Sequence, residues 1–271
     1  MLIDSHCHLL HLPPDLGDAA GIHARAREHG VHGMLSVATQ PAELAPMQAA
    51  TAGLPGVWLA AGLHPEAVDA TRAADLAALE AALLAIADAA ADGRVVALGE
   101  TGLDYLFDTP ASDEGEALRR LQRDAFAVHL EVARRRDLPV IVHTRGAVAD
   151  TLDLIRAHPG VRGVIHCFTE DAAAARAFTD CGFLLSFSGI LTFRNAASLR
   201  EVAAQVDGGM LLVETDAPWL APVPLRGKPN QPAWVSHTAA CLAQVRCTTA
   251  ELIALQTSAN FARLFGVALP D

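Results

Sequence analysis

The sequence predicts a (β/α)8 TIM barrel, and three observations support this fold class. The chain has 271 residues, of which 52% are hydrophobic, which is enough for one domain with a large core. Short and almost continuously apolar runs recur along the chain, as expected of parallel strands that are buried on both faces. Ala-rich segments with helical spacing follow most of these runs. Eight strand–helix units in a chain of this length are typical of the barrel, so we expect residues 1–271 to form a single domain.

The expected strands are short apolar runs, and the expected helices lie between them. The strands cover Leu2–His8, Gly33–Thr39, Val57–Leu63, Val95–Leu103, Pro139–His143, Gly163–Cys167, Phe183–Phe187 and Met210–Glu214. Helices with apolar residues at helical spacing follow the third to seventh strands, at Ala73–Ala91, Glu116–Arg136, Val148–His158, Ala172–Cys181 and Asn195–Val206. Glycines suited to helix ends come after four of them, at Gly93, Gly160, Gly182 and Gly208.

The composition excludes several classes of protein. The 20 basic and 31 acidic residues give a formal net charge of -11, so the chain does not resemble a basic module that binds duplex DNA. A phosphate substrate is still compatible with this charge, because metal ions can supply positive charge locally. The 5 cysteines are scattered and form neither a disulfide framework nor a zinc ribbon. No signal-peptide pattern or membrane-length apolar run is present, which predicts a cytoplasmic protein without a membrane or an obligate protein partner.

Polar residues stand where most of the expected strands end. The carboxyl ends of the strands carry the active site in this barrel, so we expect these side chains to meet. His6 and His8 alternate along the first strand and should therefore point to the same side. A single strand histidine is more often a packed core residue than a ligand, but several at equivalent strand ends indicate a metal site. The strand-end residues are His6, His8, His64, Glu100, Asp104, His143, Arg145, His166, Glu214 and Asp216.

The number of ligands predicts two metal ions. A catalytic zinc ion usually takes three protein ligands, and six groups around an open mouth fit two ions that share a carboxylate. Glu100 is the best shared ligand, because a carboxylate offers two oxygens on one short group. Mixed nitrogen and oxygen ligands suit zinc, manganese, nickel or iron, and suit magnesium less well. The six groups are His6, His8, Glu100, His143, His166 and Asp216.

The chain resembles the TatD family of metal-dependent hydrolases, often described as deoxyribonucleases, within the amidohydrolase-like barrels. The matching motifs run in order from Asp4 to Val267: DSHCHL, GLHP, GETGLDY, PVIVHTR, HCFT, SFSGILTFRNA, ETDAPWLAP and NFARLFGV. The resemblance implies that His6, His8 and Asp216 hold one metal ion and that His143 and His166 hold the other. It also implies that Glu100 bridges the two ions.

The reaction that we expect is metal-assisted hydrolysis of the phosphodiester bonds of DNA. A water between the metals would attack, and Asp216 would accept its proton and return it to the leaving group. The mouth of a barrel is a pit, so a single strand or a strand end should fit better than the middle of a duplex. His64, Arg145 and Lys228 are candidate substrate contacts, although Arg145 could instead cap the next helix and Lys228 could lie in a solvated loop.

Three positions depart from the pattern of the family. Glu170 replaces a glycine after HCFT, and Pro229 and Gln231 replace one basic and one acidic residue in the loop RGKPNQP. None of them is a predicted ligand, so these departures affect the expected substrate preference more than the chemistry.

Two alternative functions remain at this point. One is an amidohydrolase that acts on a cyclic amide, lactone or ester, which the same metals would serve. The other is a non-catalytic protein that binds a metal or a partner.

Overall fold

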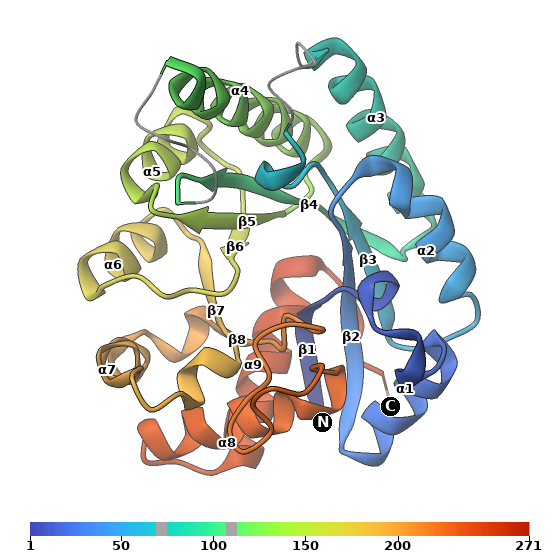
Figure 1. The fold of residues 1–271 in the computed structure, drawn as a ribbon, viewed down its shortest axis with the longest axis vertical. Coiled ribbons are helices and arrows are strands. Elements are labelled where there is room, and N and C mark those ends of the chain that lie inside the picture. Colours follow the sequence, from blue (N-terminus) through green and yellow to red (C-terminus); the bar gives the residue numbers. More distant parts are fainter. Residues whose placement is uncertain (69–74, 107–112, 271) are drawn as a thin grey trace.

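The computed structural model describes residues 1–68, 75–106 and 113–270. Within this part of the chain, eight strands form a parallel sheet in the order β1 to β8, which confirms the predicted barrel (Figure 1). The strands are β1 (Leu2–Cys7), β2 (Val31–Ala38), β3 (Val57–Ala61), β4 (Val95–Asp104), β5 (Val140–Arg145), β6 (Gly163–Ile165), β7 (Leu184–Phe187) and β8 (Leu211–Val213).

The predicted strands agree with the observed ones to within about two residues at each end. β3, β6 and β8 each end one or two residues before the predicted end. His64 follows β3 as the residue that precedes a 3-10 turn, and Cys167 and Asp216 have φ values of 45° and 57°. A left-handed residue cannot continue a strand. The chain therefore leaves the barrel wall at these points and turns the functional side chains toward the mouth.

Helices surround the barrel and cover its outer face (Figure 1). Several begin with a side chain that accepts a backbone N–H bond, as Asp171 does for the amide of Ala174 at 2.8 Å. The predicted start at Ala73 lies outside the described residues. Gly93, Gly160 and Gly182 take the expected positive φ, whereas Gly208 begins a short 3-10 turn. The helices are α1 (Ala19–Glu28), α2 (Leu44–Ala50), α3 (Leu76–Ala89), α4 (Asp113–Arg136), α5 (Val148–Ala157), α6 (Ala172–Asp180), α7 (Ala197–Gln205), α8 (Val235–Val245) and α9 (Ala250–Phe265).

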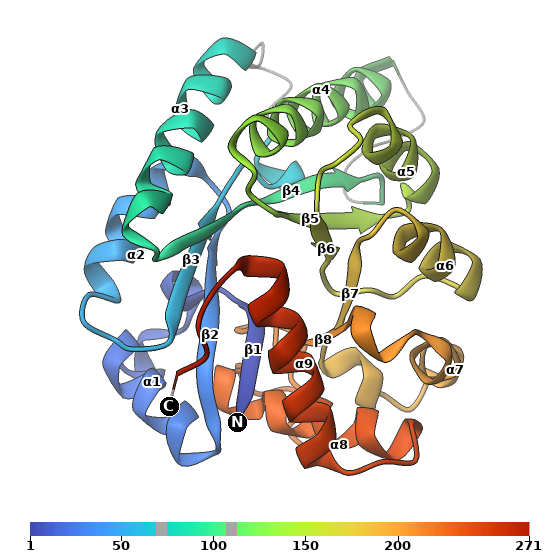
Figure 2. The same ribbon diagram turned by 180° about the vertical axis from the view of Figure 1, so that it is seen from behind.

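Helix α9 closes the barrel at the end opposite the mouth. Figure 2, seen from behind, shows α9 crossing the barrel beside both chain termini. Its residues Phe261, Leu264 and Phe265 join the side chains that fill the barrel interior, among them Ile3 and Leu35, in one buried apolar cluster. A second cluster lies between the strands and the surrounding helices. The interior is therefore packed rather than open, and the mouth is the end left for polar side chains.

The two ends of the sheet meet through the segment that follows β8. Ala217 forms an isolated parallel bridge with Cys7, and the amide of His8 donates to the carbonyl oxygen of Ala217 at 2.8 Å. The amide of Asp216 donates to the carbonyl oxygen of His6 at 3.0 Å. Closure of the barrel therefore brings the residues around His6 and His8 next to Asp216.

Among the described residues, no helix combines the length and apolar character needed to cross a lipid bilayer.

Glycines in β4 allow the close approach of β5. Gly99 and Gly102 have φ values of 121° and 134°, in a region that favours glycine. A Cβ atom at Gly99 would lie 2.6 Å from the carbonyl oxygen of Ile141, and one at Gly102 would lie 2.0 Å from that of His143. Any larger residue would push the two strands apart. These glycines therefore permit the contact between Glu100 on β4 and His143 on β5.

Candidate metal centre

The structure brings all six predicted ligand residues together at the mouth of the barrel. On one side, the Nε2 atoms of His6 and His8 lie 3.0 Å apart, as expected for alternate residues of a strand. The Oδ1 atom of Asp216 lies 3.8 Å from Nε2 of His6 and 3.4 Å from Nε2 of His8. The Oε2 atom of Glu100 faces the same two nitrogens at 3.3 and 3.6 Å. Residues far apart in the sequence thus present four ligand atoms to one point.

The other carboxylate oxygen of Glu100 faces a second group of histidines. Its Oε1 atom lies 2.7 Å from Nε2 of His166 and 3.2 Å from both Nδ1 of His143 and Nε2 of His64. The nitrogens of His143 and His166 are themselves 3.3 Å apart. Glu100 is almost fully buried, so both oxygens are held in place. The single carboxylate therefore connects two separate clusters of nitrogen atoms.

The spacing of the first four ligand atoms fits a tetrahedral metal ion. Metal–ligand bonds of about 2.0–2.1 Å place tetrahedral ligands about 3.3 Å from one another. The five measured separations among His6, His8, Asp216 and Glu100 range from 3.0 to 3.8 Å. The residues therefore fit a divalent cation in size as well as in chemistry. Three groups of side chains could each hold an ion: His6, His8 and Asp216; His6, Glu100 and His166; and His64, Glu100 and His143.

Hydrogen bonds behind three of the histidines fix which ring nitrogen is free to bind a metal. The Nδ1–H of His8 donates to the carbonyl oxygen of Val37 at 2.9 Å, which leaves the lone pair on Nε2. His143 donates from Nε2 to Asp104 at 3.0 Å, so its Nδ1 is free. His166 donates from Nδ1 to Glu214 at 3.3 Å, so its Nε2 is free. In each ring the unprotonated nitrogen points into the cluster, as ligation requires.

His6 and Asp216 are positioned in other ways. The Nδ1 atom of His6 is buried and has no hydrogen-bond partner among the described residues, but its ring stacks on that of His166 with centroids 4.1 Å apart. The buried carboxylate of Asp4 accepts the backbone N–H of Thr215 at 2.8 Å and its hydroxyl at 2.6 Å. Asp4 thereby ties β1 to the residue before Asp216. The sequence contained this residue in the motif DSHCHL, but gave no sign that it joins the two ends of the sheet.

The carboxylates of the site attract positive charge into the mouth. Burial raises the pKa of Glu100, but His166, His64 and His6 outweigh burial and hold this pKa well below its usual range. Burial lowers the pKa of His166, but Glu100 and Glu214 raise it well above its usual value, so without a cation the ring holds a second proton on Nε2 that a bound metal would replace. Buried charges of one sign are stable only when the opposite charge lies beside them. A divalent cation supplies that charge at the point where the ligand atoms converge.

His64 lies at the site, and its Nδ1 atom is hydrogen-bonded to the backbone rather than directed at the ligands. Its Nδ1 accepts the backbone N–H of Glu66 at 3.1 Å, so the neutral ring carries its proton on Nε2. That Nε2–H faces Glu100 and lies 3.2 Å from it. His64 therefore differs from the three histidines described above, because it presents a donor rather than a lone pair. This arrangement favours the predicted substrate contact over a role as a metal ligand.

The two predicted cationic contacts are placed differently. The side chain of Arg145 is 52% exposed, and its guanidinium lies 3.8 Å from the carboxylate of Asp104, close to His143. It does not cap the next helix, because α5 begins without a side-chain cap. Lys228 is exposed on the loop after β8, and no contact within the described part of the chain joins its ammonium group to the ligand residues. The structure therefore brings Arg145, but not Lys228, to the ligands.

The three positions that depart from the family pattern lie around the mouth without contacting the ligands. Glu170 is partly buried, and burial together with Asp171 raises its pKa. Pro229 is exposed on the loop after β8. The side-chain oxygen of Gln231 accepts a hydrogen bond of 3.1 Å from Arg25, which joins this loop to α1. These positions therefore alter charge near the site and not its ligand set.

Helix α4 supports the mouth through two buried polar side chains that the sequence did not single out. Gln122 accepts the amide of Asp104 at 3.0 Å and donates to the carbonyl oxygen of Pro65 at 3.3 Å. His129, seven residues later on the same helix face, donates to the carbonyl oxygen of Ala125 and accepts the amide of Leu63 at 3.0 Å. Both hold the segment that carries His64. The sequence assigned His129 only to packing, since no strand end marks it.

The burial of His129 predicts a loss of stability in acid. Burial lowers its pKa from 6.5 to about 4, so the unfolded state binds a proton at pH 5 that the native state does not. The free energy of unfolding should therefore fall between pH 7 and pH 5, by about 2 kcal/mol from this residue. Urea denaturation with a chelator present should show that His129→Gln removes this part of the pH dependence.

The control for this experiment is His158→Gln, which removes a similar bond to the carbonyl oxygen four residues earlier, but from a partly buried position. Equal changes in stability with pH for the wild type and His129→Gln would show that burial of His129 does not govern this response. The chelator is needed because metal release in acid would add its own contribution.

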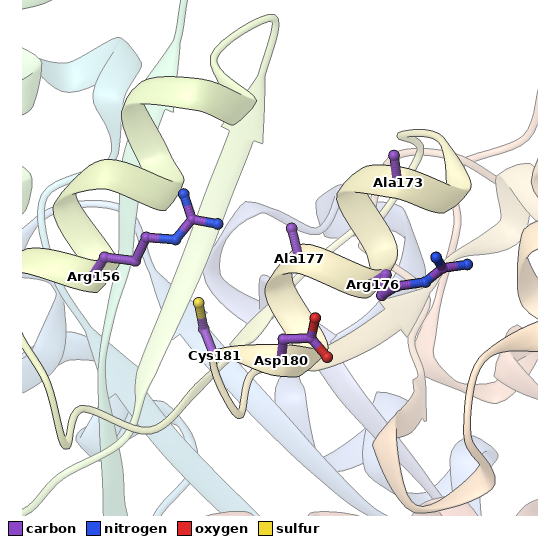
Figure 3. A pocket seen from close by; sticks show the side chains of 6 residues that line it. All are labelled: Arg156, Ala173, Arg176, Ala177, Asp180 and Cys181. Atoms are coloured by element: carbon purple, nitrogen blue, oxygen red, sulfur yellow. The ribbon is translucent and has the colours of Figure 1, made fainter.

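A pocket of about 430 Å³ lies elsewhere, between α5 and α6 on the outer helix layer. Figure 3 shows Arg156 on one side and Arg176, Asp180 and Cys181 on the other. None of the six candidate ligands lines it. The mouth of the barrel, where titratable groups converge, is therefore the better candidate for the site of chemistry.

A parallel barrel with histidines and carboxylates converging at its mouth is the arrangement expected of a metal-dependent hydrolase. Comparison with known proteins agrees with this class. The sequence model of the family described as "TatD related DNase" matches residues 3–266, so the chain belongs to that family. This confirms the resemblance that the motifs indicated.

The relatives match the chain over 90% or more of its length. It is 42% identical, over 98% of its own residues and 96% of the other protein, to the uncharacterized metal-dependent hydrolase YcfH of Escherichia coli (strain K12). It is 34% identical, over 90% of each protein, to the 3'-5' ssDNA/RNA exonuclease TatD of Klebsiella pneumoniae (strain 342). Among solved structures, it is similar to YJJV, a TatD homolog from Escherichia coli K12, with a TM-score of 0.86, 29% identity and 98% of each chain covered.

Proposed function

We propose that this metal-dependent hydrolase is a deoxyribonuclease that cleaves phosphodiester bonds of single strands or strand ends with two divalent metal ions. One observation carries the two-metal proposal: the two oxygens of Glu100 face two different groups of ligand atoms. A carboxylate in this position is suited to hold two ions side by side. The relative named as a 3'-5' ssDNA/RNA exonuclease supports the choice of substrate.

The residues divide into two ligand sets around Glu100. We propose that His6, His8 and Asp216 hold one ion and that His143 and His166 hold the other. Nitrogen and oxygen ligands in these numbers suit zinc, manganese, nickel or iron better than magnesium. When bound, such ions polarise a phosphoryl oxygen and lower the pKa of a water toward neutrality.

Asp216 is the residue best placed to move a proton during hydrolysis. Burial raises its pKa, but the hydrogen bond with His8 and the charges of the neighbouring histidines lower it below its ordinary value. The group is therefore a carboxylate at neutral pH and can accept a proton. Its side chain is 13% exposed, whereas that of Glu100 is 3% exposed, so water and substrate can reach it. We propose that Asp216 takes the proton from the attacking water and returns it to the leaving oxygen.

His64 and Arg145 are proposed to contact the substrate. The Nε2–H of His64 can donate a hydrogen bond to a phosphate oxygen at the mouth. The half-exposed guanidinium of Arg145 can reach an oxygen of the same or the next phosphate. Lys228 remains a proposed contact for a part of the strand beyond the ligands, because it is exposed on the loop after β8.

The shape and charge of the protein favour a strand end over a closed duplex. The ligand atoms lie at the end of a packed barrel, and a stiff duplex can bring few phosphates into that space. The net charge of -11 offers little long-range attraction for DNA, so binding depends on the metals and a few local groups. We therefore expect a shallow dependence of activity on salt compared with a nuclease that neutralises many phosphates.

A time course on labelled linear single-stranded, linear duplex and covalently closed circular DNA tests this function. The metal-loaded protein should cleave the single strand fastest and the closed circle slowest, and a chelator should stop all cleavage. The rates should fall only slightly across a salt series. Equal rates on closed circles and free ends would reject entry by a strand end. Absence of chelator-sensitive cleavage, together with turnover of an amide or lactone, would assign the protein to the amidohydrolases instead.

A further inference from the structure

Trp219 is an exposed aromatic residue in the segment that follows Asp216. It is 48% exposed, while Trp58 is buried and Trp234 is partly buried. A large apolar side chain in solvent forgoes the free energy of burial, and this one lies beside the candidate ligand His8.

The backbone around Trp219 is held rigidly although the indole is exposed. The amide of Trp219 donates to the carbonyl oxygen of Asp216 at 2.9 Å, and its own carbonyl oxygen accepts the side chain of Asn230 at 2.7 Å. Asn230 is fully buried and also donates to the carbonyl oxygen of Thr215 at 2.8 Å. One buried amide therefore fixes Trp219 relative to the residues on either side of Asp216. The indole is an anchored group and not part of a loosely held loop.

The indole stands beside the metal centre. Its ring centroid lies 5.0 Å from that of His8 and 6.0 Å from that of His11, both in an edge-on arrangement. The rings of His8 and His11 stack with centroids 5.5 Å apart, and Glu43 holds His11 through a contact of 3.2 Å. Trp219 therefore forms the outer part of an aromatic wall that begins at the proposed metal ligand His8.

We propose that the indole of Trp219 is a stacking platform for a nucleobase of the strand whose phosphate is bound at the metal centre. The proposal rests on the deoxyribonuclease function proposed above. Every base has a flat π-face, so stacking accepts any sequence, as an enzyme that degrades strands requires. Two arginines are engaged in other contacts: Arg226 lies over the ring of Phe193 at 3.7 Å, and Arg25 binds Gln231. On an acidic protein, stacking then adds affinity to the few phosphate contacts proposed above.

The test compares two single-stranded substrates with the metal-loaded, full-length enzyme. One is an oligothymidylate, and the other has the same sugar–phosphate backbone but abasic residues at its terminal positions. Trp219→Leu should raise KM for the oligothymidylate by about 5- to 150-fold, which corresponds to the loss of one base–aromatic contact, with little change in kcat. On the abasic strand the same variant should behave like the wild type. Trp219→Phe should stay close to the wild type on both, because it retains an aromatic face.

Leu255→Ala is the matched control, since Leu255 is 64% exposed on α9, where none of the site residues lies. It should leave KM unchanged for both strands. An equal rise in KM on both strands for Trp219→Leu, or no rise on either, would reject the platform while leaving the nuclease function standing. Failure of the wild type to cleave either strand would reject the nuclease function and the platform together.

Discussion

Replacement of Glu100 by alanine is expected to abolish most of the hydrolytic activity and to remove most of the bound metal. Glu100 faces both groups of ligand atoms, with one oxygen toward His6 and His8 and the other toward His143 and His166. Loss of a residue that only orients a ligand already lowers metal affinity or activity about 10- to 100-fold. Loss of a ligand shared by two ions should therefore exceed 100-fold.

Elemental analysis and activity assays on the same preparations test this result. Wild-type protein loaded with manganese or zinc should carry two ions per chain, and Glu100→Ala should carry one or fewer. Glu201→Ala serves as the control, because it removes an exposed carboxylate on α7, where none of the ligands lies. Circular dichroism establishes that each variant is folded. At most one ion in the wild type, or two in Glu100→Ala, would contradict the shared site.

Replacement of Asp216 by asparagine is expected to lower kcat by about two to four orders of magnitude, the usual range for loss of a general acid or base. The amide keeps an oxygen near His6 and His8, so it can still bind a metal, but it cannot accept a proton at neutral pH. The fold should be retained, because the contacts that close the barrel here come from the backbone of Asp216.

Measurement of kcat at saturating metal, alongside metal content, separates proton transfer from metal loss. Asp216→Asn should retain more metal than Glu100→Ala at comparable loss of activity. Asp124→Asn, an exposed change on α4, controls for the loss of one negative charge. An Asp216→Asn variant with kcat close to the wild type would remove Asp216 from the proton-transfer step.

Local pattern and the known behaviour of the barrel predicted the fold and the residues that meet at its mouth. Burial of a parallel strand on both faces makes it apolar throughout, so the strands stood out from the polar residues that end them. The period of two along a strand predicted that His6 and His8 would point together, and their nitrogens lie 3.0 Å apart. Parallel strands all end at the same rim, so their terminal polar residues converge whatever their separation in the sequence.

The sequence could not predict most of the supports behind these residues. It placed Asp104 among the strand-end residues without a role, yet this carboxylate orients His143, and His129 and Gln122 hold the segment of His64 from a helix. Helix α9 closes the barrel through contacts with strands far away in the chain. Each of these contacts depends on which segments pack side by side. The spacing of apolar residues along one segment contains no information about that.

The sequence by itself determined the class of fold, the positions of the strands within about two residues, and the identity of six candidate ligands. Only the tertiary structure decided which nitrogen of each ring is free, which oxygen of Glu100 faces which group of histidines, and that Trp219 stands in solvent beside His8. The physical reason is that strand pattern depends on burial along one segment. Tautomer, ligand spacing and exposure depend instead on single atoms from different segments, which approach one another only after the barrel has closed.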